Sequence, residues 1–203
     1  AGRVYYEALA IAASAIYRFF SARSDGESLV VYPSGPQSES SAFSFGRQQL
    51  DGGLCLSDYV SPGGDDNIAM FVTSFGPGVR GHAEKLIKDG EFLKAHIFQA
   101  LALEAAEAYA EFLHARLRAA WGYADPAELS RTDLFTARYH GKRYSFGYPA
   151  CPLLEDQSLL FELLAVDATL GVELTEGFMM EPESSVSAVV FHHPEASYFS
   201  LTE

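Results

Sequence analysis

The chain has 203 residues, 48% of them hydrophobic, and its 14 Lys and Arg against 27 Asp and Glu give a formal net charge of −13. This length and apolar content exclude an intrinsically disordered chain. The acidic balance argues against nucleic-acid partners, because affinity for phosphates depends on lysine and arginine. We also find no apolar run long enough to cross a membrane and no secretory signal, so we expect a cytoplasmic protein.

The N-terminal half predicts a helix followed by short strands. Residues 1–20 have a helical composition with neither a capping residue nor an initiator Met before them, which indicates a fragment, a processed chain or an excised domain. Residues 30–32 predict a short strand, and residues 54–60 are apolar around the single acid Asp58. Residues 68–75 form a continuous β-prone run between turn residues and therefore predict a buried strand.

A glycine motif follows this strand. Gly76, Gly78 and Gly81 match the G-x-G-x-x-G pattern of dinucleotide-binding loops, ahead of a short helix predicted at residues 82–88. However, Pro77 removes one backbone N–H from the loop, and a long helix lies where a second parallel strand should return. We therefore interpret the motif as a plain turn.

The clearest helix is predicted over residues 92–120, where charged residues recur at spacings of three and four. Acids at this spacing could serve a di-metal carboxylate bundle, but the accompanying Glu-x-x-His pattern is missing, so we predict a solvated face. The polar face consists of Glu104, Glu107, Glu111, His114 and Arg118, and the opposite face of Leu101, Ala105, Ala108 and Phe112.

The C-terminal half begins with a predicted linker at residues 122–133. A helix is then predicted over residues 159–170 and ended by Gly171, and a strand over residues 186–191. Because strands and helices do not alternate as in βαβ units, we predict an α+β fold with a mainly antiparallel sheet.

Histidines and cysteines give no convincing metal or nucleophile site. His192 and His193 are adjacent, so on a strand they would point to opposite faces and could not easily share an ion. Cys55 and Cys151 are far apart with no Cys-x-x-Cys pair, which predicts two reduced cysteines. We therefore predict no metal site.

The segment from Arg143 to Pro152 is the best candidate for a ligand site. Gly147 permits close backbone approach, while Pro149 and Pro152 restrict the chain and hold backbone N–H and C=O groups in place. The planar guanidinium of Arg143 suits a carboxylate. From these residues alone, a ligand site and a structural proline-rich turn remain equally good interpretations.

This segment, RYSFGYPACP, reproduces a pattern of arginine, three residues, Gly-Tyr-Pro, a small residue and proline. With it, the chain resembles the activation domain of cobalamin-dependent methionine synthase. Further blocks agree in order through most of the chain, namely residues 15–32, 55–61, 106–118, 121–123, 162–171, 174–176, 185–187 and 197–199.

The resemblance implies a C-shaped α+β domain over residues 1–203, truncated at both ends relative to the family module, with a bent, mainly antiparallel sheet and flanking helices. It implies that the domain binds S-adenosylmethionine and gives its methyl group to oxidised cobalamin. A cobalamin-binding domain of the same or a partner protein would hold the corrinoid, since the chain contains no D-x-H-x-x-G segment. A flavodoxin-like or other reductase would supply the electron.

Two alternatives to this function stay open. One is a stand-alone S-adenosylmethionine-binding sensor or reactivation partner for another corrinoid protein. The other is a structural domain that has lost ligand binding, because Tyr144 and Phe146 replace prolines usual in the family and Ala115 stands where an acid is common.

The resemblance also assigns roles to individual residues. Asp58 matches the acid that receives the ammonium group of the ligand, and Arg143 matches the arginine that binds its carboxylate. The other matching positions are Ser145 and Gly147 for backbone contacts, Tyr148 as the candidate catalytic residue facing cobalamin, and Tyr198 with Phe199 near the nucleoside.

Overall fold

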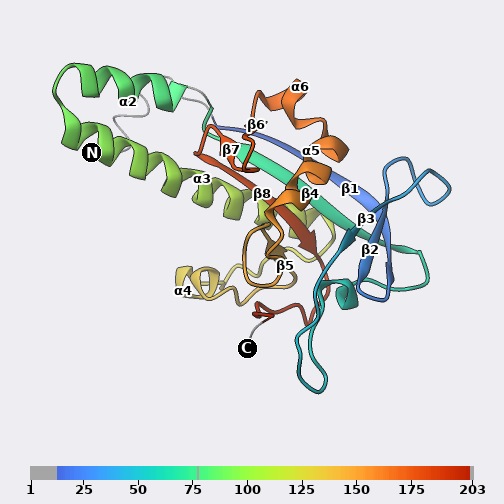
Figure 1. Ribbon diagram of the computed structural model, residues 1–203. Coiled ribbons are helices and arrows are strands. Elements are labelled where there is room, and N and C mark those ends of the chain that lie inside the picture. The colour runs from blue at the N-terminus through green and yellow to red at the C-terminus, as the bar shows by residue number, and fades with distance from the viewer. Residues whose placement is uncertain (1–12, 77, 202–203) are drawn as a thin grey trace.

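The computed structural model describes residues 13–76 and 78–201 and is built around an open six-stranded antiparallel sheet (Figure 1). The strand order β3-β2-β1-β4-β8-β5 runs through β3 (Ser41–Ser44), β2 (Ser28–Tyr32), β1 (Ser14–Asp25), β4 (Asp66–Ser74), β8 (Ser185–Phe191) and β5 (Lys142–Tyr144). A separate ribbon pairs β6 (Glu173–Leu174) with β7 (Met180–Glu181). The predicted α+β fold with a mainly antiparallel sheet is confirmed.

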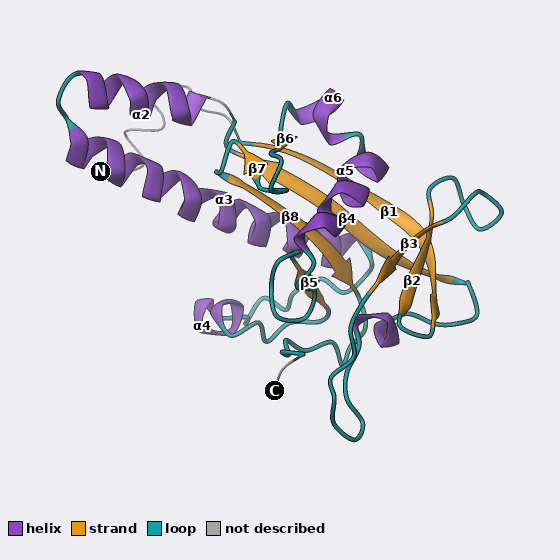
Figure 2. Cartoon of the chain, viewed as in Figure 1, coloured by secondary structure: helices purple, strands orange, loops and turns teal. Residues whose placement is uncertain are grey.

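Helices pack on both faces of this sheet (Figure 2). The α-helices are α2 (Gly78–Lys88), α3 (Phe92–Ala120), α4 (Arg131–Phe135), α5 (Gln157–Leu164) and α6 (Val166–Leu170), and the 3-10 helices are η1 (Leu56–Tyr59) and η2 (Leu154–Asp156). None of these helices is both long and apolar enough to cross a bilayer.

The neighbouring strands β4 and β8 separate two hydrophobic cores. On β4, Ile68, Met70 and Val72 face the larger core, whereas Ala69 and Phe71 face the core beneath α3. Side chains alternate between the faces of a strand, so burial on both faces makes the whole sequence of the strand apolar. The predicted buried strand at residues 68–75 is confirmed, and so is the predicted strand at residues 186–191.

The helix predicted over residues 1–20 is wrong where the structure tests it; residues 1–12 lie outside the described part. From Ser14 the chain is strand β1, which pairs with β4 over residues 14–22 and with β2 over residues 21–25. Phe20 and Ala22 face the larger core, while Phe19, on the other face, packs on Trp121 with ring centroids 4.8 Å apart. Pairing with two neighbouring strands and burial of alternate side chains outweigh local helical composition here.

Helix α3 matches its predicted bounds, but its buried face was predicted wrongly. His114 is fully buried and Arg118 is 2% exposed, whereas Phe112, placed on the apolar face, is 53% exposed. The core-facing residues are mostly alanines and leucines, namely Ala102, Ala106, Ala110, Leu113 and Leu117. Because alanines carry little hydrophobic signal, the charged periodicity dominated the pattern although part of it is buried.

The helix predicted over residues 159–170 is two helices. Ala165, which lies between α5 and α6, has a left-handed backbone (φ 50°) and breaks the hydrogen-bond ladder. The predicted end at Gly171 is confirmed by its positive φ of 63°.

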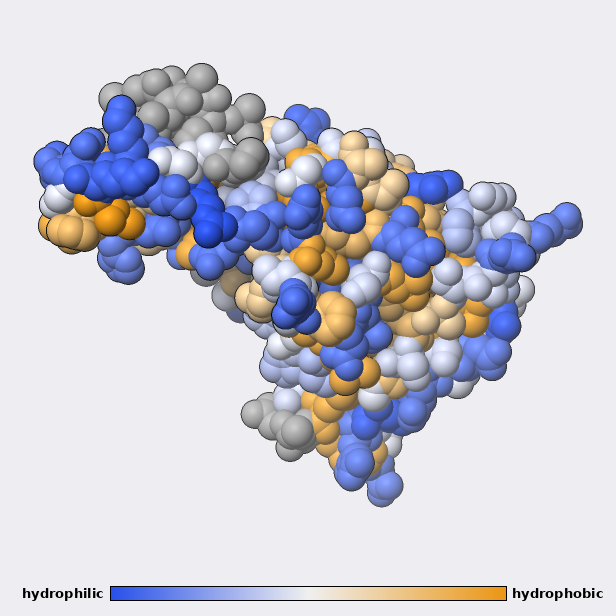
Figure 3. All heavy atoms as spheres, turned by 45° about the horizontal axis from the view of Figure 1, so that its top comes forward, coloured by the Kyte–Doolittle hydropathy of each residue, from blue (hydrophilic) through white to orange (hydrophobic). Residues whose placement is uncertain are grey.

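The glycine motif forms the entry to a helical hairpin. Helix α2 begins at Gly78, and it packs against α3 through Val79, Ala83, Phe98 and Ala102. The chain therefore continues into a second helix and not into a parallel strand, which rules out a dinucleotide-binding βαβ unit at this motif. At the far end of the hairpin, hydrophobic residues lie beside hydrophilic ones on the surface (Figure 3), and Phe92 is 66% and Leu93 72% exposed.

Candidate ligand-binding site around Arg143

A tight turn follows strand β5 and carries the predicted Gly-Tyr-Pro segment. Gly147 N donates to Cys151 O at 2.9 Å, and Cys151 N donates to Tyr148 O at 2.9 Å. Gly147 has a φ of 84°, and a Cβ at this position would approach Leu154 Cδ1 to 3.2 Å. The positive φ and the close leucine favour glycine here, and the turn leaves the Tyr148 side chain 61% exposed.

Tyr144 and Phe146, which stand where the family usually has prolines, are anchored in the larger core. Each is 4% exposed. The Tyr144 hydroxyl donates to Ser197 O at 2.6 Å, and the Phe146 ring stacks on Phe43 with centroids 5.5 Å apart. Aromatic packing thus holds the segment that prolines would otherwise stiffen.

The segment borders a cavity of about 760 Å³ at the edge of the sheet. This volume falls within the range typical of small-molecule sites. Of the predicted residues, Gly147 shapes the turn and Asp58 is not among the lining residues. The lining residues are Glu107, Arg143, Tyr144, Ser145, Tyr148, Pro149, Ala150, Tyr198, Phe199 and Ser200.

Arg143 is the cation of this cavity, and carboxylates of α3 surround it. Its side chain is 17% exposed; Nη2 donates to Glu107 Oε2 at 3.1 Å, and Nε lies 3.8 Å from Glu111 Oε2. Burial lowers the pKa of Arg143, but Glu107, Tyr198 and Glu111 together outweigh this effect and the pKa is raised. The guanidinium therefore stays charged, and Glu107 holds it only through one exposed contact.

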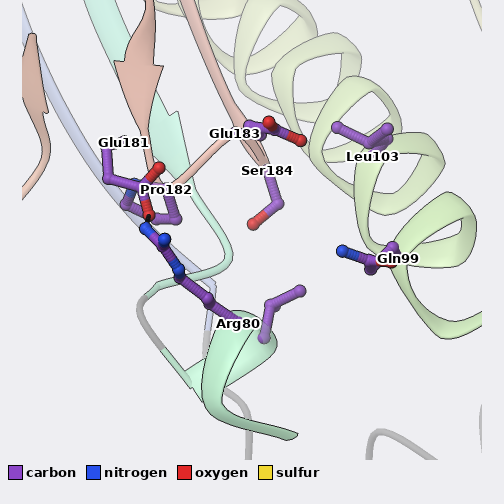
Figure 4. A pocket seen from close by; sticks show the side chains of 8 residues that line it. Arg80, Gln99, Leu103, Glu181, Pro182, Glu183 and Ser184 are labelled. Carbon is purple, nitrogen blue, oxygen red and sulfur yellow. Dashed lines mark hydrogen bonds and ion pairs between the residues drawn. The ribbon is translucent and has the colours of Figure 1, made fainter. Parts of the chain in front are cut away.

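Two smaller cavities lie next to this one along α3. A cavity of about 300 Å³ shares Glu107, Ser145 and Tyr148 with it, and a cavity of about 250 Å³ shares Leu103 and Glu183 with the second. Figure 4 shows the last of these, where Arg80 of α2 reaches Glu181 at 2.9 Å. The Arg143 cavity is thus one end of a series of hollows that follows α3.

Asp58, the predicted partner of the ligand ammonium group, is already paired. Arg47 donates to both of its carboxylate oxygens, at 2.6 and 2.7 Å, and Cys55 N donates to Oδ2 at 3.1 Å. The hydrogen bonds from Arg47 lower the pKa of Asp58. Its role in ligand binding stays a prediction.

The histidines and cysteines set aside in the sequence have structural partners. His192 Nε2 lies 2.8 Å from Asp66 Oδ1, and the His193 ring packs on Tyr59. Both cysteines are buried free thiols, and burial raises the pKa of Cys151 to about 12. Within residues 13–76 and 78–201, no three His, Cys, Asp or Glu side chains are placed to hold a metal ion.

Sequence reasoning missed Glu107 and Glu111 as site residues, because it treated them as part of a solvated helix face. Their spacing of four residues was visible and places them on successive turns of one face. The missing information was that the segment from Tyr139 to Arg143 crosses this face, which is a long-range contact.

Comparisons with known proteins identify the family of the chain. A model of the family described as vitamin B12 dependent methionine synthase, activation domain, matches residues 3–203. The chain belongs to this family. It is similar to the methionine synthases of Mycobacterium tuberculosis (strain ATCC 25618 / H37Rv; 30% identity) and Mycobacterium leprae (strain TN; 29% identity), over 93% and 97% of this chain.

A solved structure described as the MetH reactivation domain bound to AdoHcy has the same fold. Its TM-score is 0.87 at 32% identity over 93% of this chain. The chain spans 61% of that solved chain and 17% of each of the two methionine synthases. Membership of the activation-domain family is therefore shown, while the activity of a whole methionine synthase is not transferred with it.

Proposed function

We propose that this activation domain binds S-adenosylmethionine in the Arg143 cavity and presents its methyl group to cobalamin carried by another domain or a partner protein. The observation that carries the proposal is the pairing of Arg143 with Glu107 at a cavity that also holds the aromatic pair Tyr198 and Phe199. An amino acid joined to a nucleoside needs both opposite charges and flat apolar surface, and this cavity offers both.

Arg143 binds the ligand carboxylate in this proposal. The single exposed bond to Glu107 is replaced by two parallel bonds from the guanidinium to the carboxylate, which is the stronger arrangement. Glu107, released from Arg143, then takes the ligand ammonium group. Asp58 is the alternative partner for that group and would have to share or give up Arg47.

The nucleoside occupies the other part of the cavity. Tyr198 and Phe199 provide aromatic faces, and Ser145 contributes backbone contacts beside the turn that Gly147 shapes. Rings and a fixed backbone suit adenine because they are already ordered before the ligand arrives.

The proposed reaction consumes one electron and one methyl group. The methyl group leaves the sulfonium with no bonding electrons, cob(II)alamin and the added electron supply the pair for the new bond, and S-adenosylhomocysteine is released. A flavodoxin-like or other reductase supplies the electron. The domain contributes mainly by positioning, with the exposed Tyr148 facing the corrin.

Calorimetric titration of the chain with S-adenosylmethionine tests the binding part of the proposal, and saturable binding at one site is expected. The second part is tested by mixing the chain with a cobalamin-loaded binding domain, a reductant and S-adenosylmethionine, and following the absorbance of methylcobalamin. Equal methylation without the chain would exclude a reactivation role. Methylation only with an unrelated corrinoid protein would favour a separate reactivation partner over a methionine synthase module.

A further inference from the structure

Glu111 lies between two arginines, one in the cavity and one in the protein interior. Its Oε2 atom is 3.8 Å from Arg143 Nε and accepts a hydrogen bond from the Tyr139 hydroxyl at 3.1 Å. Its Oε1 atom is 3.6 Å from Arg118 Nη2. The carboxylate therefore connects the candidate ligand anchor with a group that solvent does not reach.

Arg118 is held firmly on the interior side. Its side chain is 2% exposed, its Nε donates to Asp125 Oδ1 at 2.7 Å, and its Nη2 donates to Asp125 Oδ2. The guanidinium also lies 3.9 Å from the centre of the Tyr139 ring. Asp125 belongs to residues 122–133, predicted as a linker, so this loop supplies an anchor for the buried charge.

A buried ion pair of this kind is poor evidence for stability, because the cost of removing both charges from water offsets their attraction. Its effect is to fix geometry. Asp125 and Tyr139 immobilise Arg118. On the side away from the cavity, Arg118 and the Tyr139 hydroxyl therefore fix the position of the Glu111 carboxylate.

Fixing Glu111 has a direct consequence for Arg143. Its Nε is buried without a hydrogen-bond partner among the described residues, and Glu111 is the charged group on that side. The attraction holds the Nε edge beside Glu111, while Nη2 meets Glu107, which lines the cavity. A ligand carboxylate would meet the guanidinium at this Nη2 end.

We propose that Glu111 is a positioning residue for Arg143, held in place by Arg118, Asp125 and Tyr139. It orders the guanidinium before the ligand arrives and does not touch the ligand itself. The inference rests on the proposed function, because it assumes that Arg143 binds the carboxylate of S-adenosylmethionine.

The test compares two ligands that differ in the amino-acid moiety, whose carboxylate Arg143 binds in the proposed function. S-adenosylhomocysteine has the amino-acid moiety, whereas methylthioadenosine keeps the nucleoside and the thioether without it. Glu111→Gln removes the charge but keeps an oxygen for the Tyr139 hydroxyl. We expect its Kd for S-adenosylhomocysteine to rise on the order of 10-fold, the scale of losses when an outer group that orients a binding residue is changed. The Kd for methylthioadenosine should stay within about twofold.

Glu104→Gln is the matched control, because it makes the same charge change at an exposed position of the same helix. Both Kd values should match those of the parent. The double variant Glu111→Gln with Arg143→Ala tests whether Glu111 acts through Arg143, since the effect of Glu111→Gln should then disappear.

The outcomes separate this inference from the proposed function. A parent chain that binds neither S-adenosylmethionine nor S-adenosylhomocysteine contradicts the proposed function. If the parent binds both, equal weakening of the two test ligands by Glu111→Gln, or no weakening of either, overturns the positioning role. If Glu111→Gln shows no cooperative melting transition, Glu111→Asp replaces it, since it keeps the charge but withdraws it from Arg143. A selective but smaller loss for S-adenosylhomocysteine is then expected, and an unselective loss overturns the inference.

Discussion

Two arginine–carboxylate pairs of this domain contrast in how completely each is closed. Arg47 and Asp58 share two short hydrogen bonds, and Asp58 also accepts from the backbone of Cys55. Arg143 makes one bond to the exposed Glu107, while its Nε contacts Glu111 only at 3.8 Å. The first pair is satisfied internally, and the second still has unused hydrogen-bonding capacity.

The contrast shows that a charged pair becomes a candidate binding site when its groups still have hydrogen bonds to make. Opening the Arg47–Asp58 pair for a ligand would cost two charge-assisted bonds, which are the stronger kind. A ligand at Arg143 displaces one bond from a half-exposed carboxylate and adds two. The resemblance to the family assigns both Asp58 and Arg143 to the ligand, but the geometry favours Arg143 as the stronger anchor.

Replacing Arg143 should have the largest effect. Arg143→Ala should weaken the binding of S-adenosylmethionine and S-adenosylhomocysteine by roughly 2–4 kcal/mol, the scale for truncating one partner of a desolvated charge pair. Arg143→Lys should restore only part of the lost affinity, because the lysine ammonium is a point charge and cannot form the two parallel hydrogen bonds of a guanidinium. Calorimetric titration gives both values. Unchanged affinity for both ligands in Arg143→Ala would contradict the role of Arg143 as the carboxylate anchor and, with it, most of the proposed site.

His114, which lies near Arg143, and Asp58 of the closed pair should affect stability in different pH ranges. Burial and the nearby cations Arg118, Arg143 and Lys142 lower the pKa of His114 well below its usual 6.5. The unfolded chain therefore takes up a proton first, and the free energy of unfolding should decrease as the pH falls below 6.5. Asp58 has a lowered pKa and loses its contribution only at more acidic pH, as the carboxyl group becomes protonated.

Urea unfolding between about pH 7 and pH 5 measures this dependence. His114→Phe should remove a slope of up to about 1.4 kcal/mol for each pH unit. His96→Gln is the control, because His96 is exposed on the same helix. The same slope in His114→Phe and the parent would show that His114 is not held neutral.

Exchanging the carboxylates tests which of them takes the ligand ammonium group. Glu107→Gln should weaken S-adenosylhomocysteine binding by about 1–2 kcal/mol, because the amide still accepts a hydrogen bond but carries no charge. Asp58→Asn should have a smaller effect, since Asp58 already pairs with Arg47. Titration of both variants decides the matter, and a larger loss in Asp58→Asn would give the role to Asp58 as the family resemblance implies.

The same contrast explains which features were predictable from sequence. The turn at Gly147 and the central strand at residues 68–75 were found because local chemistry determines them, through a positive φ in one case and burial on both faces in the other. The burial of Arg118 could not be predicted, because it depends on contacts with Asp125 in the loop after α3 and with the ring of Tyr139. Strand β1 was missed for a similar reason, since its pairing partners come later in the chain.

Changing Tyr148 should have the smallest effect on binding and therefore tests the outer side of the cavity. The Tyr148 ring is 61% exposed on the turn that Gly147 shapes. The ion pair with Glu107 is made by Arg143 and not by Tyr148. Tyr148→Phe removes only the hydroxyl, so the Kd for S-adenosylmethionine should stay within about twofold while the rate of cobalamin methylation in the assembled system changes. An interaction made only in the assembled complex behaves in this way. A large loss of affinity in the isolated chain would instead place the hydroxyl in the ligand pocket, and Arg143 would then no longer be the dominant polar contact of this cavity.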